Sequence, residues 1–124
     1  MIAQKRLMRL RTVAYGLLIA LLLVGCGDRI SMRQLEQLES RVNDMPDSVL
    51  TVLTATDMPR WGERRALYAL LRTQADYKCF VPITSDSLIR YATDYYDGNR
   101  KSYRAAMAHY SLGCVYSELN DDAA

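Results

Sequence analysis

Histidine and cysteine are the side chains here whose chemistry could serve catalysis or metal binding, and they are few: one histidine and three cysteines. His109, Cys79 and Cys114 are too few, at their spacings, to supply the four convergent ligands of a structural zinc site. The sequence has no glycine-rich phosphate loop and no Gly-x-Ser-x-Gly motif. Asp94 and Asp97 lie three residues apart, a spacing typical of a solvated helix face. We therefore expect no enzymatic activity, no metal and no cofactor, with His109 in a packing or surface role.

The third cysteine, Cys26, ends a segment whose composition differs from the rest of the chain. The uncharged apolar run 13–24 follows four basic residues, Lys5, Arg6, Arg9 and Arg11. The run is shorter than the roughly 20 residues that a helix needs to cross a bilayer. A basic region before a short apolar region is typical of a secretory signal peptide. Asp28 and Arg29 end the run, which disfavours an uncleaved membrane helix through Cys26.

The end of this segment, Leu23-Val24-Gly25-Cys26, resembles the lipobox of bacterial lipoproteins. The resemblance implies cleavage before Cys26, whose thiol would carry a diacylglycerol. Two or three acyl chains would anchor the protein firmly, because a single chain gives only marginal binding. We expect a signal peptide over residues 1–25, a lipidated tether over 26–31 and a protein on the exported side of a membrane in the bacterial cell envelope. The sequence favours neither the inner nor the outer membrane.

The charge of the chain changes when the signal peptide is set aside. Four of its 16 basic residues lie in residues 1–25 and all 14 acidic residues follow, so the mature chain has 12 basic residues against 14 acidic, a formal charge of −2. The basic residues are scattered, and nothing in them indicates nucleic-acid binding. Cys79 and Cys114 would lie in an oxidising compartment, where a disulfide between them and two buried free thiols are both open.

From Met32 onward the apolar residues recur at helical spacing, and no segment alternates with period two over the length of a strand. The pattern predicts five helices, at 32–43, 46–57, 61–79, 85–97 and 103–119. Prolines and Gly98 mark their ends or starts. Helices joined by short turns pack antiparallel to their neighbours. We expect an all-α domain over residues 32–124.

The last predicted helix carries a motif. Leu112-Gly113 followed by Tyr116 resembles helix A of a tetratricopeptide repeat (TPR), although His109 stands where that family has a large aromatic residue. Residues 120–122, Asn-Asp-Asp, resemble the turn between helices A and B. The resemblance implies that Gly113 lets the next helix approach closely, and that Leu112 and Tyr116 fill the grooves between helices.

An earlier segment fits the same family more weakly. Leu88, Ala92 and Tyr95 have the spacing of the small and aromatic positions of helix B in a TPR, and Val49, 39 residues before Leu88, begins a fainter copy. Because the family period is 34 residues, the repeats are degenerate. The implied architecture is a degenerate TPR-like solenoid of antiparallel helix pairs.

A lipobox followed by such helices is similar to the N-terminal part of bacterial TPR lipoproteins and membrane sensor-regulators. The resemblance implies a membrane-anchored scaffold that binds a protein or peptide partner. The alternatives are a truncated or vestigial copy without a partner, and the sensory head of a longer regulator. The many tyrosines of the second half fit either filled inter-helix grooves or an aromatic peptide-binding surface.

The sequence ends at Ala124, where helix B of the last repeat would begin. We therefore expect a domain truncated at its C-terminus, because a solenoid needs a capping element there. Its last helix should leave apolar residues uncovered and favour self-association. The residues expected on that face are Leu112, Val115, Tyr116 and Leu119.

Overall fold

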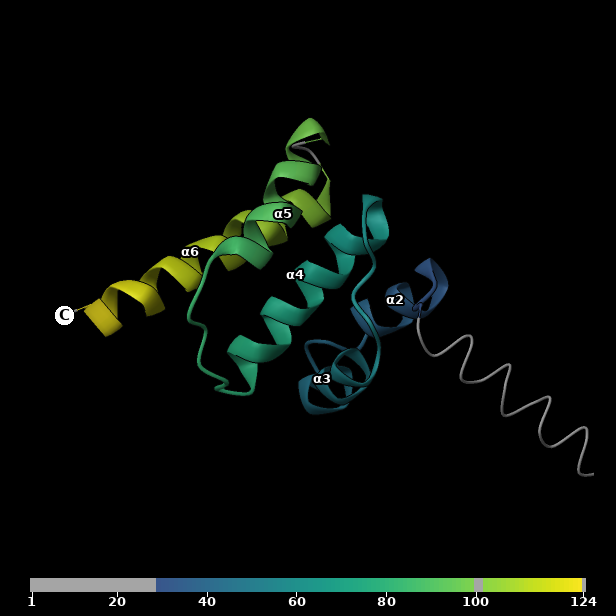
Figure 1. Ribbon diagram of the computed structural model, residues 1–124, viewed down its shortest axis with the longest axis horizontal. Helices are drawn as coiled ribbons and strands as arrows, with labels where there is room; N and C mark the ends of the chain where they lie inside the picture. Colours follow the sequence, from purple (N-terminus) through teal and green to yellow (C-terminus); the bar gives the residue numbers. More distant parts are fainter. Residues whose placement is uncertain (1–28, 100–101, 124) are drawn as a thin grey trace, which may run out of the picture.

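The structure is a computed structural model that describes residues 29–99 and 102–123 (Figure 1). Within these ranges the chain forms five α-helices and one 3₁₀ turn, and no strand. The prediction of an all-α fold with five helices is confirmed. The elements are α2 (Met32–Glu39), α3 (Pro46–Ala55), α4 (Gly62–Lys78), α5 (Ser87–Tyr96), η1 (Asp97–Asn99) and α6 (Tyr103–Ala123).

Local sequence signals explain where the first helices begin. Ser31 caps α2 in a reciprocal arrangement: its Oγ accepts from the Gln34 amide at 3.2 Å, and the Gln34 side chain accepts from the Ser31 amide at 3.0 Å. Pro46 occupies the first turn of α3, where its missing N–H leaves no bond unmade. Ile30 is buried, only 2% exposed. Residues 30 and 31, which the sequence analysis assigned to the tether 26–31, therefore belong to the folded domain, and residues 26–28 lie outside the described residues.

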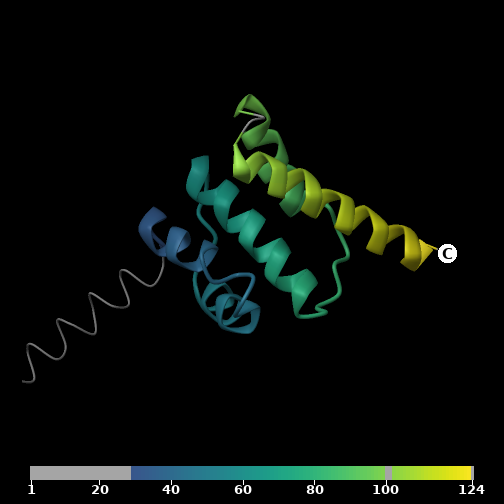
Figure 2. The ribbon, with the colours of Figure 1, turned by 180° about the vertical axis from the view of Figure 1, so that it is seen from behind.

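The helix α4 is the centre of the molecule, and it packs against α2, α3, α5 and α6. Figures 1 and 2 show α4 running between α2 and α3 on one side and α5 and α6 on the other. Tyr68 of α4 donates a hydrogen bond to the carbonyl of Leu53, at the end of α3, over 3.0 Å. The fully buried side chains that form the core include Leu35, Val49, Leu53, Leu67, Leu71, Ile89, Ala92, Ala108 and Val115.

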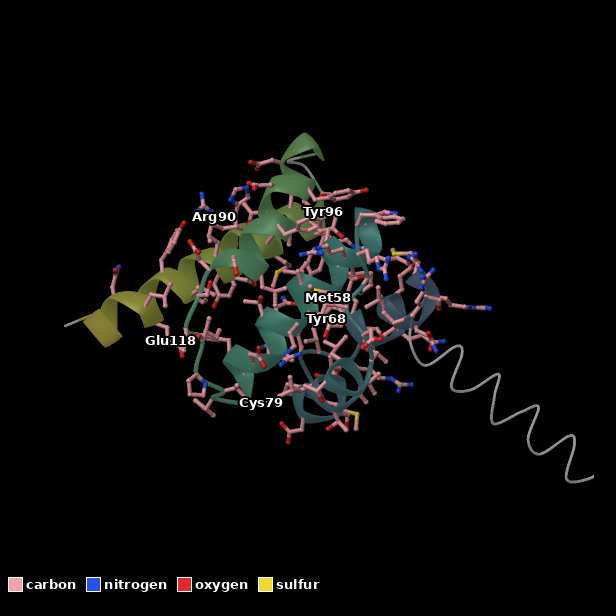
Figure 3. The ribbon with its side chains drawn as sticks, in the orientation of Figure 1. Met58, Tyr68, Cys79, Arg90, Tyr96 and Glu118 are labelled. Atoms are coloured by element: carbon pink, nitrogen blue, oxygen red, sulfur yellow. The ribbon has the colours of Figure 1, made fainter. Side chains whose placement is uncertain are left out.

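The last helix is longer than the sequence pattern predicted. Residues 120–122 lie inside α6, so the expected turn at Asn-Asp-Asp is wrong. Asparagine and aspartate lower helix propensity by only a few tenths of a kcal/mol, and no glycine or proline stands there to end the helix. The C-terminal half of α6 extends past the other helices in both views (Figures 1 and 2). This C-terminal half of α6 contacts the loop after α4: the Ile83 amide donates a hydrogen bond to the Glu118 carboxylate at 3.2 Å. Figure 3 shows Glu118 beside that loop.

Candidate functional site

A groove of about 200 Å³ runs between α4 and α6. We call it the α4–α6 groove. Its lower walls include Thr73, Gln74 and Ser111, which are buried. Its rim includes aromatic side chains that remain exposed: Tyr77 at 44%, Tyr110 at 66% and Phe80 at 91%. The lining residues come from the turn after α2, from α4 and its C-terminal end, and from α6: Asn43, Thr73, Gln74, Tyr77, Lys78, Phe80, Met107, Tyr110, Ser111 and Cys114.

Phe80 is the most exposed large apolar residue among those described, and its backbone is strained. Its φ of 59° lies in the left-handed region, where a side chain with a Cβ costs roughly 1–2 kcal/mol. The Phe80 amide donates to the Tyr77 carbonyl at 3.3 Å, and the Val81 amide donates to the Asp76 carbonyl at 2.9 Å. These two bonds form a Schellman motif, whose left-handed position is usually glycine. The end of α4 thus holds a bare phenyl ring at the groove, in a conformation unfavourable for phenylalanine.

Phe80 was not predicted as a site residue from the sequence. The available signal was local: phenylalanine stands two residues after the last residue of α4, at the position where such a helix end usually has glycine, and Pro82 follows two residues later. Apolar residues at a predicted helix end are normally assigned to the core, and only the structure shows that this one lies outside it.

The two cysteines of the folded domain are free thiols, so the open question of a disulfide is answered in favour of unpaired residues. The Cys79 Sγ donates to the Asp47 carboxylate at 3.1 Å and so connects the end of α4 to the first turn of α3. Burial, and then this carboxylate, raise the pKa of the Cys79 thiol. Cys114 lines the groove, and its proximity raises the pKa of the Tyr77 phenol.

An ion-pair network fixes the helices that flank the groove relative to one another. Arg104 of α6 donates to the Glu39 carboxylate of α2 through Nε at 2.9 Å and Nη2 at 3.0 Å, and to Glu63 of α4 through Nη1 at 2.7 Å. The hydrogen bond with Glu39 is the largest cause that raises the pKa of Arg104. A bidentate pair of this kind sets orientation as well as distance. Alternate helices of the chain, α2, α4 and α6, are thereby connected through one side chain.

The motif residues of α6 differ in how far they are buried. Leu112 is half-buried against the core, as a groove-filling residue should be, whereas Tyr116 is 43% exposed. Gly113 is exposed, and a Cβ built there would meet nothing within 4 Å. No described element therefore approaches Gly113, and the expected close helix contact is not formed by residues 29–99 or 102–123.

The uncovered face of α6 differs from the expected one. Val115 is fully buried, and Leu112 and Leu119 are half-buried against the core, so the expected exposure of these three residues is wrong. The exposed side is instead formed by residues such as Ala106, Tyr110 and Tyr116. The reason is that α6 has apolar residues all round, and packing against α4 and α5 decides which of them face inward.

The motif residues of α5 are shifted by one position from expectation. Ala92 is fully buried and Leu88 is half-buried against the core, but Tyr95 is 46% exposed. Tyr96 takes the buried place, and its ring meets that of Tyr95 edge-on at 5.3 Å between centroids. Burial raises the pKa of the Tyr96 hydroxyl, which has no hydrogen-bond partner among the described residues.

The described residues contain no cluster of three or more histidine, cysteine or acidic side chains placed to hold a metal. His109 instead contacts Asp97, with 2.8 Å between Nε2 and Oδ1, and the two side chains are 51% and 41% exposed. The lipobox residues and Cys26 lie outside the described residues. None of the described helices combines the length and the apolar character needed to cross a bilayer.

Searches with protein-family models, curated proteins and solved structures found no significant match to this chain.

Proposed function

We propose that this protein is a membrane-anchored lipoprotein of the bacterial cell envelope, whose helical domain is a TPR-like scaffold for a protein or peptide partner. The anchor would be Cys26, and the partner would bind along the α4–α6 groove. No cofactor and no catalytic step belong to this function.

The order in which the helices pack supports a repeat-like arrangement. The main contacts join helices that are neighbours in the chain, α3 with α4, α4 with α5 and α5 with α6, or next but one, α2 with α4 and α4 with α6, whereas α2 packs mainly on α4 rather than on α3. Repeat proteins stack in this quasi-one-dimensional way. In this interpretation α2, α4 and α6 are the A helices, and α3 and α5 are the B helices.

One observation carries the binding role: the rim of the α4–α6 groove presents Phe80 almost fully exposed, at 91%, on a left-handed backbone. Neither burial nor backbone geometry favours phenylalanine at this position in the isolated domain. A partner that covers the ring would supply the missing burial, which stabilises a large apolar side chain by about 1.5–3 kcal/mol. Exposed aromatic residues beside a pocket are typical binding hot spots.

Site-specific photocrosslinking tests the groove. A photoreactive phenylalanine analogue at Phe80 should capture one discrete partner in membranes of the native cell. The matched control is the same analogue at Tyr95, which is also aromatic and 46% exposed but does not line the groove. Equal capture at both positions, or none at Phe80, would contradict the scaffold proposal and favour the vestigial alternative.

Metabolic labelling with a fatty-acid analogue tests the anchor separately. The wild-type protein should incorporate the label, and Cys26→Ser should abolish incorporation because the acylated thiol is gone. Cys79→Ser and Cys114→Ser are matched controls that keep Cys26, and they should label like the wild type. Labelling that persists in Cys26→Ser would refute the lipoprotein assignment, but it would not bear on partner binding in the α4–α6 groove.

A further inference from the structure

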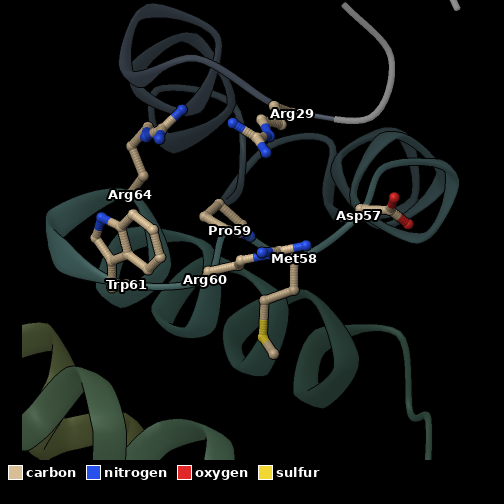
Figure 4. A pocket seen from close by; sticks show the side chains of 7 residues that line it. All are labelled: Arg29, Asp57, Met58, Pro59, Arg60, Trp61 and Arg64. Carbon is tan, nitrogen blue, oxygen red and sulfur yellow. The ribbon is translucent and has the colours of Figure 1, made fainter. Parts of the chain in front are cut away.

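A second concave surface, which we call the arginine hollow, lies where the chain enters the folded domain. Its volume is about 270 Å³. It combines the segment before α2 with the segment that leads into α4. Figure 4 shows Arg29, Arg60, Trp61 and Arg64 around Pro59, with Asp57 at the far side.

The arginine hollow is rich in arginine, and its guanidinium groups form no ion pair with any described residue. It holds three arginines and one aspartate. By contrast, Arg72, Arg90 and Arg104 each pair with a carboxylate. Unpaired arginines in a concave surface favour an anionic ligand, and their planar guanidinium groups suit phosphate.

The arginine hollow also carries a large exposed aromatic side chain. Trp61 is 70% exposed, and Met58, which also lines the arginine hollow, is 38% exposed. Trp61 lies in extended backbone just before Gly62, whose φ of 75° is readily adopted only by glycine. The start of α4 therefore holds the indole outside the core. Tryptophan with neighbouring basic residues is typical of the interface between a membrane and water.

The length of chain between the anchor and the domain sets the position of the arginine hollow. Arg29 lines it, and the next residue, Ile30, is buried in the core. Arg29 is the third residue after Cys26, and three residue steps span at most about 11 Å. The headgroup layer of a bilayer is about 5–8 Å thick on each side. With Cys26 lipidated, the arginine hollow cannot be far from the headgroups.

We propose that the arginine hollow docks on anionic phospholipid headgroups of the membrane that holds the anchor. Arg29, Arg60 and Arg64 bind phosphate oxygens, and the Trp61 indole enters the interfacial layer. This inference rests on the proposed lipid anchor for its geometry. It makes the folded domain a body held against the membrane in one orientation, rather than one swinging on a tether.

Trp61 is the only tryptophan of the chain, so its fluorescence reports on this site alone. The full lipidated protein is reconstituted in nanodiscs of phosphatidylcholine, with or without phosphatidylglycerol, that contain lipids brominated near the headgroup. In anionic discs we expect blue-shifted emission and strong bromine quenching, both weakened by high salt. Emission that is equally solvent-exposed in both kinds of disc would overturn the proposal.

Charge-removal variants make the test specific. Each arginine near an anionic surface changes the docked population roughly fivefold, so the double variant Arg60→Gln/Arg64→Gln should lower the docked-to-undocked ratio about 25-fold. Arg90→Gln is the matched control, since Arg90 is exposed on α5 and away from the arginine hollow (Figure 3). Circular dichroism confirms that each variant is folded. Equal quenching in the double variant and the control would exclude the arginines from the contact.

Two further measurements distinguish membrane docking from a site for soluble phosphate and from a failure of the lipid anchor. If inorganic phosphate alone changes Trp61 emission as much as anionic discs do, the arginine hollow is a site for a soluble phosphate and membrane docking is wrong. If the protein carries no acyl chain, it is added to preformed vesicles of the same compositions, and the same dependence of Trp61 emission on anionic lipid is required. Failure of the anchor and failure of docking are thus measured separately.

Discussion

At Phe80, both the backbone conformation and the solvent exposure are unfavourable for phenylalanine. The left-handed φ of 59° disfavours any Cβ, and the ring is 91% exposed. Neighbouring residues enforce this conformation, because the Phe80 and Val81 amides close the end of α4. Strain of this kind at a groove rim indicates function rather than stability.

We expect Phe80→Gly to be more stable than Phe80→Ala by about 1 kcal/mol, because both variants lose the ring but only alanine keeps the strained Cβ. Urea unfolding measures the difference. Both variants should lose partner binding, since the ring itself is absent. Equal stability of the two would mean that residue 80 leaves the left-handed region in solution.

Gly113 offers a second test at a single position. A methyl group there meets nothing within 4 Å, so none of the described residues makes the close helix approach that was expected at Gly113. We expect Gly113→Ala to raise the free energy of unfolding by about 0.5–1 kcal/mol, because alanine loses less backbone entropy in a helix. A fall in the melting temperature would reveal an element packed on this face.

At the scale of the elements, the sequence predicts where helices lie far better than which way they face. Capping at Ser31 and the proline at 46 are local signals, and α2 and α3 begin where these signals place them. No such signal ends α6, so its end was mispredicted. Tertiary contacts decide which side of a helix faces the core, and for this reason Tyr96 rather than Tyr95 is buried.

The candidate site likewise depends on tertiary contacts that local sequence signals do not indicate. The groove depends on two helices and a turn that are distant in the sequence, and the sequence predicted only that an aromatic surface was one alternative. The arginine hollow joins Arg29 to residues 57–64, a contact that no local pattern indicates. Only the basic and aromatic residues themselves were visible beforehand, and they looked scattered.

The Arg104 network should couple helices measurably. In double-mutant cycles by urea unfolding, Arg104→Ala and Glu39→Ala should show a coupling free energy of about 1–3 kcal/mol, because the pair is bidentate and mostly buried. The cycle with Glu63→Ala is the matched comparison and should give less, since the Glu63 side chain is 42% exposed. Couplings in the reverse order would mean that α2 is held by other contacts.

At the scale of the whole molecule, the two concave surfaces lie toward opposite ends of α4. The arginine hollow involves residues 57–64, and the α4–α6 groove involves residues 73–80. A helix of 17 residues is about 25 Å long. If one end rests on headgroups, the groove stands roughly one helix length away from it, where a partner has access.

The uncovered face of α6 bears on the oligomeric state. The four residues expected to form an apolar patch do not form one: Val115 is buried, Leu112 and Leu119 are half-buried, and only Tyr116 is exposed. A stable dimer needs about 800 Å² of good contact on each partner. Tyr116 and Tyr110, separated by small and polar residues, fall short of that. We therefore expect no self-association through α6.

Sedimentation velocity on the chain from residue 27 onward, at tens of micromolar, should show a monomer, and Tyr116→Lys should leave the sedimentation coefficient unchanged. A chain starting there keeps Ile30 and every other buried residue of the described core. A dimer that Tyr116→Lys dissociates would restore the expectation of an interacting α6 face. A dimer that Phe80→Ala dissociates would place self-association in the α4–α6 groove, with a second copy as its occupant.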